Sequence, residues 1–174
     1  MKLYYFETPN GRKACAVARY LNSRVEFVRV DLSKGEHKAP AFLAINPNGK
    51  VPALEDGDVR LWESAAIMCY LADQAGSSLW PKDARQIDVI RWLSWDATHF
   101  SRHAGTLFFQ QVIKPHFGLG DPDLAAIDEA MGFFRQFAGV LNSHLEGRGY
   151  LVGDGLTVAD FALAAFLPHA HEAR

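Results

Sequence analysis

The sequence predicts two units in one chain, an α/β unit followed by an all-helical unit. Short strand-like and helix-like patterns alternate over residues 1–76, and strand patterns are absent from residue 85 onward. Between the two units, residues 77–84 have the serine and proline content of a linker. With 174 residues, 49% of them hydrophobic, the chain can bury a core in both units.

The first unit has the element order of a thioredoxin-like fold. In chain order we expect a strand at 2–6, a helix at 11–21, a strand at 25–31, a short helix at 41–44, strands at 51–54 and 59–62, and a helix at 65–75. Asp56-Gly57 favours a tight turn between the last two strands. The order β-α-β-α-β-β-α predicts a thioredoxin-like sheet, which indicates a fold and not yet an activity.

The second unit, residues 85–174, shows helical periods. One long helix is expected to end near Pro115, and another is expected to begin with Asp121 as its cap and Pro122 in its first turn. Thr157 and Asp160 have the spacing of a capping box, with Asp in place of Glu. The helical unit is therefore expected to contain at least three separate helices.

Composition excludes several classes of function. The 18 basic and 20 acidic residues give a formal charge of −2, which provides no basic field for nucleic acid or anionic lipid. The chain starts in a strand-like run without a signal segment and has no stretch of ~18 apolar residues, so we expect a cytoplasmic protein without nucleic-acid or membrane partners. Cys15 and Cys69 are too few for a disulfide scaffold and are expected to be reduced and packed.

A turn in the first unit is suited to a ligand's sulfur. In Thr8-Pro9-Asn10-Gly11 a strand enters a helix whose exposed amides carry partial positive charge. Thiol pKa values fall at such helix N-termini beside hydrogen-bond donors, so the turn can hold a ligand thiolate, with Thr8 and Asn10 as donors. The alternative is that these residues only form the turn and cap the helix.

Two further segments are suited to a peptide ligand. A cis Val51-Pro52 bond is expected at the start of a strand, where the Val51 amide and carbonyl can pair with a peptide backbone. Glu63 can accept from an ammonium group, and Ser64 can bind a carboxylate at a helix N-terminus. The alternatives are an ordinary edge proline and an ordinary helix cap.

These motifs, in this order along the chain, resemble the cytosolic glutathione transferase superfamily. The resemblance rests on Thr8-Pro9-Asn10-Gly11, the run Asn46-Pro47-Asn48-Gly49-Lys50-Val51-Pro52-Ala53-Leu54, Glu63-Ser64 and residues 157–161. The first turn in particular resembles bacterial members related to the yeast prion-like and nu-class proteins, which act as glutathione transferases, peroxidases and disulfide reductases.

The resemblance implies that glutathione is the co-substrate and that no metal is needed. It implies that Val51 and Pro52 meet the cysteinyl backbone, that Glu63 and Ser64 hold the γ-glutamyl head, and that Lys50 and His37 approach the glycine carboxylate. Family members place Tyr, Ser or Cys beside the sulfur. Here Asn10 is the first choice as donor, Thr8 the second, and Tyr5 a rival that can equally be a packed strand aromatic.

The resemblance also implies a second-substrate pocket on the first long helix of the helical unit. The residues offered there are aromatic or cationic: Trp95, His99, Arg102, His103 and Phe108. His99 and His103 are four residues apart, but the segment has no HExxH glutamate and no third ligand, so a metal site is not expected.

The predicted activity is that of a glutathione transferase. The enzyme would ionise glutathione and deliver the thiolate to an electrophilic carbon, a peroxide or a mixed disulfide. The alternative is a non-catalytic binding or regulatory module with the same fold. The family pattern further implies a homodimer, and the chain, which ends at Arg174, is expected to be short at its C-terminus compared with family members.

Overall fold

The computed structural model describes residues 1–167 and divides the chain into two compact units, Met1–Lys82 and a second that begins at Asp83. The first unit is a mixed four-stranded sheet in the order β2-β1-β3-β4, with β1 parallel to β2 and antiparallel to β3. Its elements are β1 (Lys2–Tyr5), α1 (Pro9–Tyr20), β2 (Glu26–Arg29), η1 (Glu36–Lys38), α2 (Pro40–Leu43), β3 (Ala53–Asp56), β4 (Val59–Trp62) and α3 (Ser64–Gln74). This topology confirms the predicted thioredoxin-like unit.

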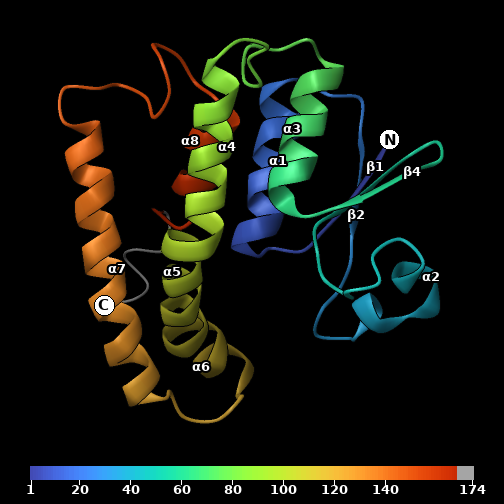
Figure 1. Cartoon of the computed structure of the whole chain (residues 1–174). Coiled ribbons are helices and arrows are strands. Elements are labelled where there is room, and N and C mark those ends of the chain that lie inside the picture. Colours follow the sequence, from blue (N-terminus) through green and yellow to red (C-terminus); the bar gives the residue numbers. More distant parts are fainter. Residues whose placement is uncertain (168–174) are drawn as a thin grey trace. The chain divides into compact units, whose positions relative to one another are not determined.

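The two faces of the sheet have separate coverings. Leu3 and Leu54 lie opposite each other on β1 and β3 and are fully buried. Helices α1 and α3 pack side by side against this face (Figure 1). Because side chains alternate along a strand, Tyr4 and Ala53 point to the other face, where they pack against Phe42 of α2. The core therefore fixes the sheet between two helices on one face and one on the other.

The helical unit contains one continuous helical run over residues 85–117. It consists of α4 (Arg85–Trp95), the π-helical η2 (Asp96–Phe100), α5 (Ser101–Phe108), the π-helical η3 (Phe109–Ile113) and α6 (Lys114–Phe117). The run ends at Phe117, near Pro115 as predicted, and Gly118, whose backbone is left-handed, caps it. The two π-helical segments were not expected from the sequence.

Helix α7 (Leu124–Leu145) begins two residues later than predicted, and α8 (Val158–Ala164) follows it. Its cap is Asp123, whose carboxylate accepts from the Ala126 amide at 3.0 Å, and not Asp121. A tertiary contact explains the difference, because the buried Gln110 accepts from the Asp123 amide at 2.9 Å. Within residues 1–167, no helix combines the length and the apolar character that a membrane crossing requires.

The predicted capping box at the start of α8 is present. The Asp160 carboxylate accepts from the Thr157 amide at 2.8 Å and from the Thr157 hydroxyl at 2.9 Å. Its second oxygen accepts from the Leu151 amide at 2.9 Å. One half-buried carboxylate therefore joins the helix start to the preceding loop and helps to place Val158 and Ala159, which are fully buried.

We expect Asp160→Ala to lower the free energy of unfolding by about 2–3 kcal/mol, because it removes an ionised acceptor from three donors. Urea unfolding followed by circular dichroism measures the change. Asp128→Ala is the matched control: Asp128 is an exposed aspartate on α7, and its loss is expected to cost less than about 0.5 kcal/mol. Equal losses in the two variants would contradict the role assigned to the capping box.

Candidate active site

The register of the sheet brings the three predicted ligand segments to one edge. Tyr4 of β1 pairs with Ala53 of β3, and Ala53 pairs with Trp62 of β4. From this row, β1 runs on into the turn with Thr8, β3 is preceded by Val51-Pro52, and β4 runs on into Glu63-Ser64. The turn with Thr8 therefore lies at the same end of the sheet as two segments that are more than 40 residues further along the sequence.

The N-terminus of α1 keeps one free main-chain donor at this edge. Pro9 has no N–H, and the Gly11 and Arg12 amides donate to the Thr8 hydroxyl oxygen and carbonyl at 3.3 and 2.9 Å. The Asn10 amide makes no hydrogen bond with the part of the chain that the structure describes. Thr8 is the helix cap and is half-buried, while the Asn10 side chain is exposed. The donors near this helix end are thus the Thr8 hydroxyl and the Asn10 main chain and side chain.

The N-terminus of α3 is more open than that of α1. The amides of Ser64, Ala65 and Ala66 have no acceptor among residues 1–167, and no side chain caps the helix. Glu63, which precedes them, has φ of 70° and ψ of 121°. A non-glycine residue in this region stores about 1–3 kcal/mol of backbone strain, which is most often found at binding sites. This conformation of Glu63 leads the chain from β4 into α3, whose N-terminus carries partial positive charge.

The Val51-Pro52 peptide bond is cis, as predicted. The strand itself starts at Ala53, two residues later than expected, so the Val51 main chain lies beyond the ladder between β1 and β3. Asn46 holds the loop before it. Its side chain is buried, donates to the Lys50 carbonyl at 2.6 Å and accepts from the Asn48 amide at 3.0 Å.

Asn46 was missed as a functional candidate in the sequence, although it belongs to the run that carries the family resemblance. The available signal was its place two residues before Asn48, since asparagine often accepts from a main-chain amide two residues on. Its buried side chain fixes the Lys50 carbonyl and therefore the entry into the cis peptide bond.

A second loop lies against this one. Lys38 of η1 donates to the Gly49 carbonyl at 3.5 Å, and a Cβ at Gly49, whose φ is 58°, would touch this lysine and the His37 carbonyl. The Nδ1 atom of His37 is buried without a hydrogen-bond partner among the described residues, and Lys50 is exposed. His37 and Lys50 thus come from adjoining loops, and Lys38 is a further basic residue there that the sequence did not single out.

Tyr5 is held by neighbours in the sheet. Its ring meets Phe27 of β2 edge to face with centroids 6.2 Å apart. The guanidinium carbon of Arg19 lies 4.7 Å from the centroid of the Phe27 ring. The residue therefore packs as a strand aromatic, and the half-buried ring is part of the sheet surface.

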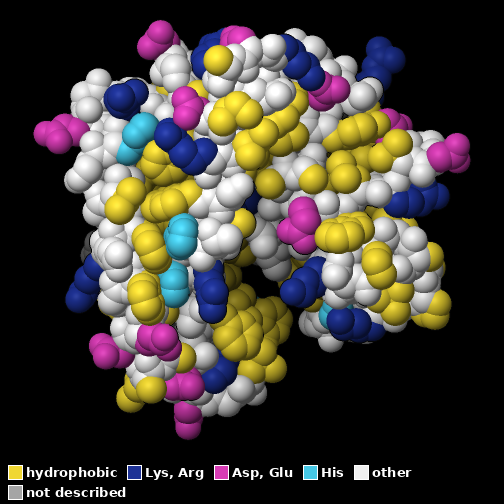
Figure 2. Space-filling model, viewed as in Figure 1, with side chains coloured by type: hydrophobic (Ala, Val, Ile, Leu, Met, Phe, Trp, Pro, Cys, Tyr) yellow, Lys and Arg dark blue, Asp and Glu magenta, His cyan; other side chains and the backbone are white. Residues whose placement is uncertain are grey.

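Of the five predicted second-substrate residues, some pack against aromatic rings and others are exposed to solvent. Trp95 stacks on Phe100, His99 and His103 lie against Phe137 of α7, and Phe108 is buried against Phe166. His99 and Arg102 are exposed. Burial, and secondarily the nearby Arg102 charge, lowers the pKa of His103. Figure 2 shows histidine side chains among hydrophobic ones over the region of α5 and α7.

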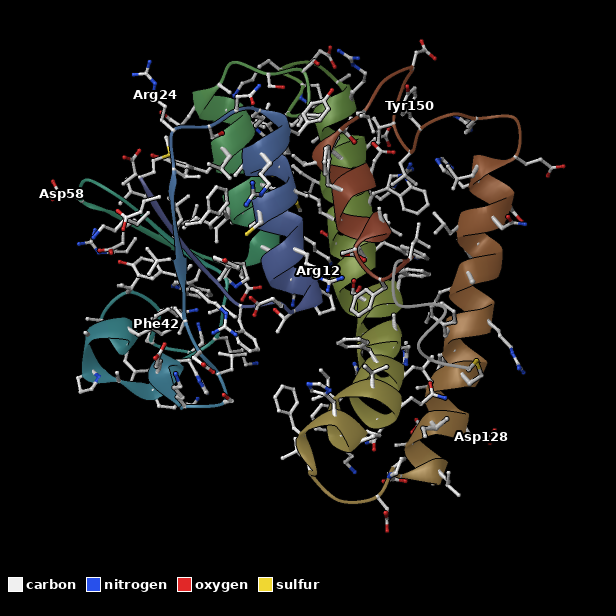
Figure 3. The ribbon with its side chains drawn as sticks, turned by 180° about the vertical axis from the view of Figure 1, so that it is seen from behind. Arg12, Arg24, Phe42, Asp58, Asp128 and Tyr150 are labelled. Carbon is white, nitrogen blue, oxygen red and sulfur yellow. The ribbon has the colours of Figure 1, made fainter. Side chains whose placement is uncertain are left out.

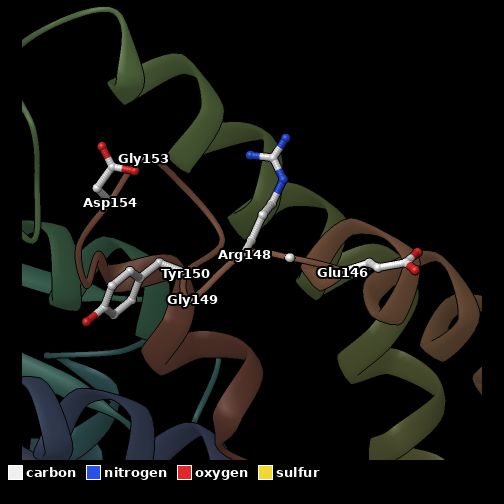
Figure 4. A pocket seen from close by; sticks show the side chains of 7 residues that line it. Glu146, Arg148, Gly149, Tyr150, Gly153 and Asp154 are labelled. Carbon is white, nitrogen blue, oxygen red and sulfur yellow. The ribbon is translucent and has the colours of Figure 1, made fainter.

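Two hollows in the helical unit lie apart from most of these residues. One of about 560 Å³ is formed by the glycine-rich loop after α7, with Glu146, Arg148 and Asp154 pointing in different directions around it (Figure 4). Another of about 270 Å³ between α4 and α7 includes Trp92 and Trp95. Among residues 1–167, no three histidine, cysteine or acidic side chains are grouped as metal ligands would be.

The fold and the sheet edge define a class of protein: a thioredoxin-like unit with two open helix N-termini beside a cis-proline loop, followed by a helical unit. Two family models match the sequence. "Glutathione S-transferase, N-terminal domain" covers residues 1–73, and "Glutathione S-transferase, C-terminal domain" covers residues 111–173.

Relatives with known names match nearly the whole chain. Glutathione S-transferase 3 of Zea mays is 38% identical over 178 aligned positions, which cover 100% of this chain and 79% of that protein. A probable glutathione S-transferase of Oryza sativa is 35% identical and covers 95% of this chain and 78% of its own length. The chain belongs to the glutathione S-transferase family.

Solved structures agree with the sequence relatives. The structure of glutathione S-transferase III in apo form matches with a TM-score of 0.85 and 37% identity, covering 97% of this chain and 79% of that one. A possible glutathione S-transferase from Rhodopseudomonas palustris matches with a TM-score of 0.89 and 30% identity, covering 99% and 84%. Glutathione S-transferase-I bound with lactoylglutathione matches with a TM-score of 0.81 and 29% identity, covering 95% and 80%.

Neither cysteine of the folded protein is expected to react readily with a thiol reagent. Burial raises the pKa of Cys15 to about 11 and that of Cys69 to about 12. At about pH 8, roughly one part in a thousand or less of each is thiolate, and the fraction rises only as the pH approaches these values. Iodoacetamide labelling followed by mass spectrometry measures the reactivity.

Urea-unfolded protein at the same pH is the control, and both cysteines should label there. A Cys15→Ala variant is expected to keep the glutathione-dependent activity of the parent protein. Fast labelling of Cys15 in the folded protein would instead make this thiol a candidate nucleophile.

Proposed function

We propose that this protein is a glutathione transferase that binds glutathione at the sheet edge and delivers its thiolate to an electrophilic second substrate. The observation that carries the proposal is the convergence of the Thr8 turn, the Val51-Pro52 loop and Glu63-Ser64 beside two helix N-termini with free amides. A tripeptide with two carboxylates, an ammonium group and a thiol matches this set of donors and acceptors.

The binding roles follow the chemistry of each segment. The Val51 main chain, which lies beyond the ladder, pairs with the cysteinyl backbone, and Pro52 shapes that loop. The free amides of α3 and the Ser64 hydroxyl bind the γ-glutamyl carboxylate, and Glu63 accepts from the ammonium group. His37 and Lys50, which come from adjoining loops, meet the glycine carboxylate, and Lys50 is the exposed residue of the two.

Thiol activation falls to Thr8 and Asn10, through different atoms. The Thr8 hydroxyl oxygen already accepts from Gly11, so its proton is available to a sulfur anion. The Asn10 main-chain amide is the free N–H of this helix end. The Asn10 side chain, the first choice from the sequence, is exposed. We therefore place the Thr8 hydroxyl and the Asn10 amide first, the Asn10 side chain second and the packed Tyr5 third.

The second substrate is assigned to the helical unit. His99 and Arg102 are exposed there, while Trp95, His103 and Phe108 supply aromatic surface and packing. A small hydrophobic electrophile, a peroxide or a disulfide suits this mixture. If the turn resembles the nu class in function as well, peroxide or disulfide reduction is a further activity. The sequence relatives from Zea mays and Oryza sativa are called glutathione S-transferases. A homodimer in the cytoplasm fits the family and the two unpaired cysteines.

An activity panel tests the proposal. Glutathione with an aryl halide, an organic hydroperoxide and hydroxyethyl disulfide is expected to give turnover with at least one acceptor, together with retention on immobilised glutathione. Ser64→Ala should weaken retention by about tenfold or more, because it removes one hydrogen bond to a charged group. Retention without turnover or thiolate formation would favour the non-catalytic binding module. Absence of retention would contradict both the transferase and the glutathione-binding module.

A titration of bound glutathione assigns the activating donor. We expect Thr8→Val to raise the pKa of the bound thiol by about one unit, which leaves roughly tenfold less thiolate at neutral pH. Thr8→Ser should keep the pKa low, and Asn10→Ala and Tyr5→Phe should change it little. Ultraviolet absorbance of the thiolate against pH gives the values. A larger shift in Asn10→Ala than in Thr8→Val would return the role to the asparagine side chain.

A further inference from the structure

The turn between β1 and α1 is tightly built. The Thr8 amide donates to the Phe6 carbonyl at 2.7 Å, and a Cβ at Gly11 would overlap that same carbonyl oxygen. The residues before Thr8 therefore lie directly against the first turn of the helix. A shift of Phe6 or Glu7 would move the Thr8 hydroxyl and the hydrogen bonds that Thr8 accepts from Gly11 and Arg12.

One guanidinium group holds this turn from the neighbouring strand. Arg29 ends β2, where it pairs with Tyr5 of β1. Its Nε lies 2.9 and 3.2 Å from the two Glu7 carboxylate oxygens, and its guanidinium carbon lies 4.6 Å from the centroid of the Phe6 ring. Arg29 therefore contacts both residues that precede Thr8.

The guanidinium group is itself fixed from the other side. Arg29 donates to the Asp31 carboxylate at 3.3 Å, and that carboxylate accepts from the amide and the hydroxyl of Ser33 at 3.0 and 2.6 Å. Three contacts on a planar, rigid group restrict its position more than a single ion pair would.

We propose that Arg29 is a positioning residue for thiol activation: by holding Phe6 and Glu7, it sets the place of the Thr8 hydroxyl and of the first amides of α1. This inference rests on the proposed function, because it assumes that the sulfur lies at that helix end. Arg29 acts through the turn and does not itself touch glutathione.

Exposure limits what this contact does for overall stability. The side chains of Arg29 and Glu7 are 46% and 50% exposed, and exposed ion pairs contribute little to the free energy of unfolding. Substitution of Arg29 is therefore expected to affect the turn without a large change in the free energy of unfolding. The hydrogen bond from Arg29 lowers the pKa of Glu7, so the carboxylate stays ionised and paired beside the sulfur site at neutral pH.

The test compares Arg29→Met, Glu7→Ala, their double variant and the control Arg24→Met. Arg24 is an exposed arginine that stands away from the rest of the molecule in Figure 3 and takes part in no ion pair among the described residues. The readouts are the pKa of the bound glutathione thiol, kcat and KM for glutathione, and amide hydrogen exchange at Gly11 and Arg12 without ligand.

Arg29→Met is expected to reduce the thiolate fraction and kcat at neutral pH by about twofold to fivefold, the range of an exposed ion-pair network, with KM for glutathione changing less than about twofold. Exchange at Gly11 and Arg12 should become faster. Glu7→Ala should raise the thiol pKa as well, and the double variant should add nothing further. Arg24→Met should match the parent protein in every readout.

A lowered thiol pKa in Glu7→Ala would overturn the proposal, because it would show that Glu7 and Arg29 act only through their charges. Unchanged exchange and thiol pKa in Arg29→Met would overturn it as well. If the parent protein binds glutathione without ionising it, the proposed function fails, and with it the role of Arg29 in activation. The exchange rates would still report in that case whether Arg29 holds the turn.

Discussion

The pairing of Tyr4 with Ala53 and of Ala53 with Trp62 is the constraint on which the candidate site depends. A slip of one residue would move every side chain of a strand to the opposite face, so burial of Leu3 and Leu54 holds the register in place. The site residues lie just beyond the ends of these strands. Their positions are therefore set by the hydrophobic core. The exposed Asn10, Lys50 and Glu63 contribute little to that core, so substitution of these residues need not cost the fold.

The same edge carries features that oppose stability. At the start of α3, three amides have no acceptor within residues 1–167, and Glu63 lies outside its preferred backbone conformation. The start of α8 has more of its donors paired, since Asp160 accepts from the Thr157 and Leu151 amides. At the start of α3, in the candidate site, a bound carboxylate would supply the missing acceptor, whereas Asp160 ties the start of α8 to the preceding loop.

The sequence predicted local features well and long-range contacts poorly. Hydrophobic periods, the Asp56-Gly57 turn and the motif order were sufficient for the two-unit fold, because each depends on neighbouring residues. The start of α7 was misplaced because Asp121-Pro122 has the local signature of a helix start, whereas the hydrogen bond from the Asp123 amide to Gln110 depends on the fold. Arg29 escaped notice for the same reason, since the fold brings Glu7 to it from the turn after β1. Asn46 was missed although its partners Asn48 and Lys50 are local.

The two cysteines of the chain are not a source of thiolate at neutral pH. Burial keeps Cys15 and Cys69 protonated at neutral pH, so a thiolate at the α1 N-terminus has to arrive with a ligand. A main-chain amide serves this purpose whatever side chain stands at position 10, whereas the Thr8 hydroxyl depends on the turn that presents it. Activation thus divides into a part supplied by helix geometry and a part supplied by one side chain. Both parts are tied to the turn that Arg29 holds, because a shift of Phe6 or Glu7 would move the Thr8 hydroxyl and the first amides of α1 together.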